Sequence, residues 1–178
     1  RWYKETGGGL MTDWGAHMFD IAQWGLRMDD SGPVKIIPAG FEGAPYLKYI
    51  YESGLEMEVK PFNGETRGVK FWGSDGWIEI SRDAFNASDE ALKPVVNETD
   101  VPYEARAGHH ENFIQAVKDQ VDPEVPVEIG HRTNTVCVLG NIAHELGKAV
   151  EWDPASESFS DDTNTRQLTR AYNNDYTL

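Results

Sequence analysis

The hydrophobic period changes along this chain, and that change limits the folds open to it. Residues 13–27 carry apolar side chains at helical spacing, behind Thr12, a residue type that caps first turns. From Val34 to Ser81 the period is two, as in 55–59, where apolar and charged residues alternate. Helical spacing returns after residue 108. The pattern predicts an α+β fold, with strands in the middle of the chain layered against helices.

Short turns separate the apolar runs in this middle region. They are marked by a Ser-Gly pair at 53–54, an Asn-Gly pair at 63–64 and an Asp-Gly pair at 75–76. Short connections join antiparallel neighbours, so we expect a meander of four or five strands. Residues 84–105 are polar and contain proline, which predicts a loop.

Two longer helices are expected in the second half of the chain. One runs from His109 to about Val121 and is predicted to bury Phe113, Ile114 and Val117. The other spans roughly 130–147, with four apolar residues at three- and four-residue spacing on its core side: Val136, Leu139, Ile142 and Leu146. A strand at 149–152 and a last short helix at 163–171 complete the expected elements.

Composition narrows the class of protein. The chain has 178 residues, 39% of them apolar, which is enough for one domain with a buried core. A net charge of −14 argues against a nucleic-acid partner, because little would neutralise phosphates, and the apolar runs are too short to span a membrane. The single cysteine, Cys137, excludes an internal disulfide and lies in an apolar run, which predicts a buried residue rather than a nucleophile.

The stretch GGGLMTDWGAHMFD at 7–20 carries the candidate chemistry. Asp13, His17 and Asp20 are spaced i, i+4 and i+7, so a helix places them on one face. A carboxylate beside an imidazole can move a proton near neutral pH. The alternatives are a packed or solvated histidine and a carboxylate favoured only by the helix dipole. No metal is expected, since no further ligand stands at useful spacing.

The same string resembles the start of the substrate domain in the glucose–fructose oxidoreductase and inositol dehydrogenase (Gfo/Idh/MocA) family. There a glycine-rich approach leads to an Asp-x-x-x-His motif. Four further segments, 68–82, 109–117, 129–154 and 166–172, look like segments of bacterial members in the family's order. The resemblance therefore covers nearly the whole chain.

The resemblance implies an open, mostly antiparallel sheet with helices on one face, formed by residues 1–178 as a single substrate-binding or oligomerisation domain. The family's N-terminal Rossmann domain is expected to be missing, because the chain has no Gly-x-Gly-x-x-Gly fingerprint, lacks the family's Glu-Lys-Pro segment and begins at Arg1. We therefore expect a fragment of a two-domain enzyme that is inactive alone. NAD or NADP would be the cofactor of the full-length enzyme, with none bound by this chain.

The resemblance also implies roles for individual residues in the oxidation of a sugar, polyol or sugar derivative. His17 would be the general base and Asp13 would orient it or bind a neighbouring hydroxyl. Asp20 and Trp14 would contact the substrate or support the residues that do. Trp2 and Tyr3 would border the nicotinamide.

Several alternatives stay open at this point. Some family members use the cofactor transiently to cleave glycosidic bonds, and a non-enzymatic carbohydrate-binding or oligomerisation module is a further possibility. Self-association is expected through the open face of the sheet. The histidines at 109, 110, 131 and 144 are interpreted as structural or solvated, and Arg132 as an ion-pair or carbonyl-binding residue.

Overall fold

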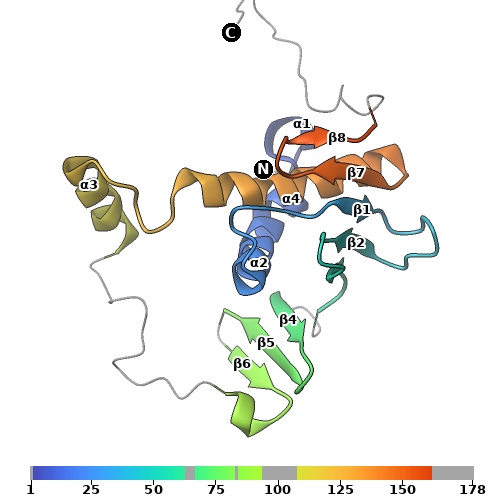
Figure 1. Ribbon diagram of the computed structural model, residues 1–178, viewed down its shortest axis with the longest axis horizontal. Helices are drawn as coiled ribbons and strands as arrows, with labels where there is room; N and C mark the ends of the chain where they lie inside the picture. Colours follow the sequence, from blue (N-terminus) through green and yellow to red (C-terminus); the bar gives the residue numbers. More distant parts are fainter. Residues whose placement is uncertain (1, 63–66, 83, 94–107, 162–178) are drawn as a thin grey trace, which may run out of the picture. The chain divides into compact units, whose positions relative to one another are not determined.

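The computed structural model describes residues 2–62, 67–82, 84–93 and 108–161 (Figure 1). These fall into two compact units, one drawn from Arg1–Pro61 and Arg132–Leu178, the other from Phe62–His131. The helix expected at 163–171 lies outside the described residues. Within the described residues, no helix is both long enough and apolar enough to cross a membrane.

The first unit is built on a five-stranded antiparallel sheet. Its order is β3 (Glu56–Val59), β2 (Leu47–Ile50), β1 (Lys35–Ile37), β7 (Val150–Asp153) and β8 (Ser158–Phe159). The strand predicted at 149–152 is confirmed, and it pairs with β1 through the register Ile36 to Val150. The predicted meander is therefore extended by strands from the far end of the chain.

Two helices cover one face of this sheet, α2 (Leu10–Leu26) and α4 (Val127–Leu146), as Figure 1 shows. A short helix, α1 (Lys4–Gly7), precedes them. The buried core joins Phe19 of α2 to the apolar side of α4 and to the inward-facing residues of the strands. The predicted core positions of α4 are confirmed, since Val136, Leu139 and Ile142 are buried and Leu146 packs against them.

The other face of the sheet is charged. Lys48 of β2 pairs with Glu56 of β3 at 2.9 Å and with Glu58 at 3.8 Å, and Lys35 of β1 pairs with Glu42 at 3.3 Å. The alternation of the strands explains this, because the same period that buries one side chain exposes the next. Ile37 and Ile50 lie on the same face by register, and self-association through it stays a prediction.

The closest approach of helix and sheet is made by Tyr49 and Gly140. Tyr49 of β2 is fully buried, and its hydroxyl donates a hydrogen bond of 3.0 Å to the carbonyl of Val136 in α4. A Cβ at Gly140 would overlap that hydroxyl. Burial raises the pKa of Tyr49 well above its usual value. Glycine at 140 thus lets α4 lie directly against the phenol ring.

A buried polar network secures the end of α2. Tyr51 donates to Oε1 of Gln23 at 2.6 Å, and Nε2 of Gln23 donates to the carbonyls of Met28 and Ser31 at 2.9 and 3.2 Å. Arg27, in a left-handed conformation with φ of 58°, ends the helix. The glutamine thus joins Tyr51 to the turn that leads toward β1, where the Met28 carbonyl also accepts from the N–H of Ser31 at 3.2 Å.

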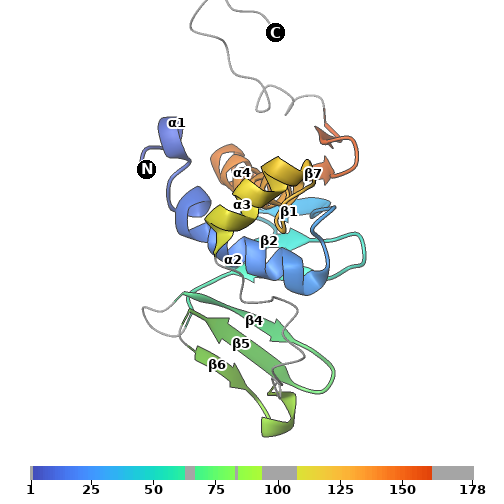
Figure 2. The same cartoon turned by 90° about the vertical axis from the view of Figure 1, so that its left-hand side faces the viewer.

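The second unit contains a three-stranded antiparallel sheet, β4 (Gly68–Trp72), β5 (Trp77–Ser81) and β6 (Ala84–Ala87), with β5 in the middle (Figure 2). A 3₁₀ turn, η1 (Glu90–Leu92), and a helix, α3 (His109–Asp119), follow. The single meander of four or five strands expected between Val34 and Ser81 is wrong, because the five strands found there are divided between two sheets, β1 to β3 in one and β4 and β5 in the other.

Three further sequence predictions are wrong in detail. Residues 84–87, predicted as part of a loop, form β6, because pairing with β5 supplies the order that their composition does not indicate. Phe113, Ile114 and Val117 are more than half exposed rather than buried, and Ala116 is the buried residue of α3. An amphipathic stripe predicts an apolar face but not its partner.

The third error concerns where the helices start. Helix α2 begins at Leu10 after Gly9, so Thr12 lies within its first turn and is not the cap. Gly9 has φ of 73°, a conformation that glycine adopts without steric cost. Helix α4 begins at Val127, three residues before the predicted start.

Gly140→Ala should destabilise the first unit. The added methyl group overlaps the Tyr49 hydroxyl, and overpacking of this kind costs about 1–3 kcal/mol of unfolding free energy. Urea denaturation monitored by circular dichroism measures the change. The matched control is Gly130→Ala on the same helix, where nothing lies within 4 Å and better helix propensity should leave stability equal or slightly higher. Equal stability of the two variants would contradict the packing argument.

Candidate active site on helix α2

The glycine run that leads into α2 is held from two sides. Gly8 and Gly9 have φ of 71° and 73°, and Thr12 donates to the carbonyl of Gly9 at 3.2 Å and to that of Gly7. Asn141 of α4 donates to the carbonyl of Gly8 at 2.8 Å. The start of α2 is thus tied both to its own first turn and to the helix packed beside it.

The predicted acid–imidazole pair lies on the first two turns of α2. Asp13 is in the first turn, where a carboxylate interacts favourably with the helix dipole, and His17 follows four residues later on the same face. His17 is exposed and Asp13 is half-buried. The ring of Trp14 lies 5.8 Å from that of His17, centroid to centroid. The arrangement offers an accessible imidazole next to a carboxylate and an indole.

Asp20 lies one turn after His17 on the same face of α2, and a residue of another helix binds its carboxylate. The buried hydroxyl of Thr133 on α4 donates to Oδ1 of Asp20 at 3.1 Å. Sequence reasoning missed Thr133 and Asn141, because both look like ordinary members of a long helix. Their only signal is a polar side chain close to the core stripe of α4.

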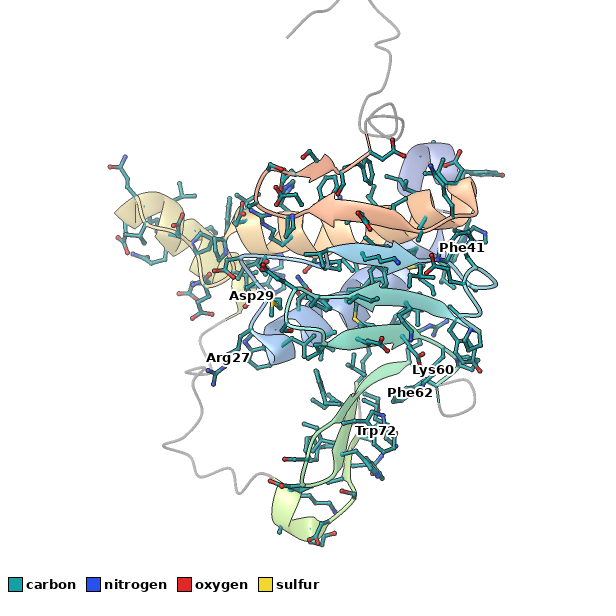
Figure 3. All side chains as sticks on the ribbon, turned by 45° about the vertical axis from the view of Figure 1, so that its right-hand side comes forward. Arg27, Asp29, Phe41, Lys60, Phe62 and Trp72 are labelled. Carbon is teal, nitrogen blue, oxygen red and sulfur yellow. The ribbon has the colours of Figure 1, made fainter. Side chains whose placement is uncertain are left out.

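A second carboxylate adds negative charge beyond the end of α2. Burial raises the pKa of Asp29, and the nearby charges of Asp20 and Asp30 act in the same direction. Oδ1 of Asp29 is buried, and it has no hydrogen-bond partner among the described residues. Figure 3 labels Asp29 close to Arg27, in the turn that follows the helix. Asp20 therefore lies in a carboxylate-rich region, held there by Thr133.

The other candidate residues lie outside α2. Trp2 and Tyr3 are exposed, just before α1. Arg132 donates to the carbonyl of Pro154 at 2.6 Å and pairs with Glu157 at 3.3 Å, which confirms its predicted structural role. His109 and His110 are exposed, with ring centroids 4.1 Å apart.

Neither a metal site nor a reactive thiol is found in the part of the chain that the structure describes. No three His, Cys, Asp or Glu side chains gather there in a way that could hold an ion. Cys137 is fully buried, and burial raises the pKa of its thiol to about 12, so the thiolate is not available near neutral pH. The prediction that Cys137 is a packed core residue is confirmed.

Comparison with known families identifies the chain. Residues 1–177 match the family model described as the oxidoreductase family, C-terminal alpha/beta domain. The chain belongs to the Gfo/Idh/MocA oxidoreductase family. No curated protein and no solved structure matches it. The α+β fold with antiparallel sheets agrees with a C-terminal domain of this family, which confirms the predicted fold class.

Asn141→Ala should loosen the approach to α2 without unfolding the unit. Loss of the bond to the Gly8 carbonyl should make amide exchange at residues 8–13 about fivefold faster, the equivalent of about 1 kcal/mol. Hydrogen exchange followed by NMR gives the rates. Asn134→Ala, an exposed asparagine on the same helix, is the control and should leave those amides unchanged. The same acceleration in both variants would show that the bond does not hold the loop.

Proposed function

We propose that this chain is the substrate-binding part of a NAD(P)-dependent oxidoreductase that acts on a sugar, a polyol or a sugar derivative. The observation that carries the proposal is the exposed His17 one helical turn after Asp13, in a chain that matches the family's C-terminal domain over residues 1–177. The pair lies on a helix held by α4, so its geometry is set before any ligand binds.

In the proposed reaction the chain's own residues handle the proton. When bound, the nicotinamide would supply the acceptor for the hydride of the carbinol carbon. His17 takes the proton of the hydroxyl group on that carbon, so that loss of the C–H hydride and the O–H proton leaves a carbonyl. The Asp13 carboxylate stabilises the imidazolium that results and orients the ring. Trp14, 5.8 Å from His17, supplies an apolar surface beside the reacting carbon.

The described residues do not themselves fit the pyrophosphate of the cofactor. Every strand pair in both sheets is antiparallel, whereas the dinucleotide fold needs a parallel βαβ unit with a glycine-rich turn. The proposed function therefore assigns the nucleotide to a separate domain. In that arrangement Trp2 and Tyr3, whose rings are exposed, would border the nicotinamide.

The chain alone should bind neither NAD nor NADP tightly. Without a loop of backbone N–H groups around the phosphates, dissociation constants of about 1 mM or weaker are expected. Isothermal titration calorimetry with each cofactor measures them. Micromolar binding would show that this chain has a nucleotide site and would contradict the proposal that a separate domain binds the nucleotide.

His17→Ala, made in the enzyme that contains both domains, should lower kcat by about 10²- to 10⁴-fold, the usual contribution of a general base. Asp13→Asn keeps the shape, removes the charge and should lower kcat by less. The dissociation constant of the cofactor should not change in either variant. Stopped-flow measurement of cofactor reduction with a panel of sugars and polyols gives these values.

His109→Ala and His131→Ala are the controls, since both residues are interpreted as structural. Near-normal kcat in a correctly folded His17→Ala variant would reject the base assignment. Sugar release without net cofactor reduction would favour the glycosidase chemistry found in the same family. Loss of kcat in His109→Ala alone would move the base to α3.

A further inference from the structure

We propose that the three-stranded sheet of the second unit carries a separate binding site for the pyranose ring of a neutral carbohydrate. Its members are three residues that frame the ring, Lys70, Trp72 and Trp77, and two that position the lysine, Glu79 and Asn86. All five lie on β4, β5 and β6. The site does not depend on His17 or on the function proposed for α2.

Strand register places these side chains on one face of the sheet. Lys70 is opposite Glu79, Trp72 is opposite Trp77, and Glu79 is opposite Asn86. Residues directly opposite one another in an antiparallel pair share a face. The other face is apolar, with Val69, Phe71, Ile78, Ile80 and Phe85. The sheet thus has one face made for packing and one made of aromatic and polar groups.

One of the two indoles of the site, that of Trp72, is open to solvent, whereas that of Trp77 is half-buried. Trp72 is 69% exposed, at the end of β4 (Figure 3), and its ring centroid lies 6.2 Å from that of Trp77 with the planes at 56°. Packing among the described residues of this unit does not account for an indole left in water. Lys70 lies over one face of each ring, so the exposed indole of Trp72 offers its other face to a flat ligand.

The polar part of the site is held in place before a ligand arrives. Nζ of Lys70 lies 3.5 Å from the ring centroid of Trp77, 4.7 Å from that of Trp72 and 3.6 Å from Oε2 of Glu79. Glu79 is buried, and Nδ2 of Asn86 donates to its Oε1 at 3.3 Å. A buried carboxylate is retained only when it is paired, so Glu79 works here as the anchor for Lys70.

The charges and aromatic rings of these side chains favour one class of ligand over the others. Lys70 already occupies the cation position over both rings, which disfavours a cationic ligand. Glu79 beside it, in a chain with a net charge of −14, disfavours an anion. A purely apolar ligand would bury the ammonium with the Glu79 carboxylate as its one acceptor, although the group has three N–H donors to satisfy. A pyranose has C–H groups on its flat faces for the indoles and hydroxyl groups around its edge for the ammonium.

The test is a titration of the full chain with methyl β-D-glucopyranoside and with cellotetraose, followed by ¹⁵N-edited NMR of the tryptophan side chains. Saturable shifts of Trp72 and Trp77, with a dissociation constant of about 1–10 mM for the monosaccharide, are expected of a small open site. Trp72→Ala should weaken binding about tenfold. Trp72→Phe keeps an aromatic ring and should retain part of the affinity, with fold integrity checked from the β5 amides.

Two controls separate this site from the one on α2. Trp24→Ala removes a tryptophan of similar exposure, 62%, from the first unit and should leave binding unchanged. His17→Ala should also leave it unchanged, so failure of one proposal does not imply failure of the other. Lack of saturable shifts in the wild type, or equal affinity in Trp72→Ala, overturns the inference. Concentration-dependent dimerisation that Trp72→Ala abolishes, without any sugar response, would identify the face as a protein interface instead.

Discussion

The contact between Tyr49 and α4 is the constraint on which the first unit depends. A tyrosine on a central part of the sheet needs a partner for its hydroxyl when it is buried, and the Val136 carbonyl supplies one. The ring can reach that carbonyl only because residue 140 has no side chain. Helix and sheet therefore meet at one defined depth and rotation, since the hydrogen bond and the missing Cβ allow few alternatives.

That defined position of α4 sets the position of the candidate active site. Thr133 and Asn141 lie eight residues apart on α4, about 12 Å along a helix axis. Thr133 donates to Asp20, and Asn141 donates to the carbonyl of Gly8. One helix therefore holds α2 near its beginning and again past its middle. Asp13 and His17 lie between these two attachments. A side chain that must meet a reacting atom gains from such support, because small displacements are costly in catalysis.

How far the sequence predicts this structure depends on how local each feature is. The helical face of Asp13, His17 and Asp20, the core stripe of α4 and the strands between 35 and 81 follow from period and turn chemistry. The division of those strands into two sheets, the insertion of β7 beside β1 and the attachment of Asp20 to Thr133 do not. Each of these joins residues far apart in the chain, and local pattern carries no information about such pairings. Thr12 failed as a cap for a different reason, because Gly9 tolerates a backbone conformation that displaces the helix start.

Helix α2 carries both residues that pack against the core and residues of the candidate active site. Residues 13, 17, 20 and 24 follow a single line along α2, and the last of these, Trp24, is largely exposed. Phe19, Ala22 and Gln23 lie on the buried side and bind α2 to the core and to Tyr51. Because the two lines use different residues, substitutions at 13, 17 and 24 leave the buried contacts of α2 intact. Asp20 is the exception on the exposed line, because Thr133 holds α2 through its carboxylate.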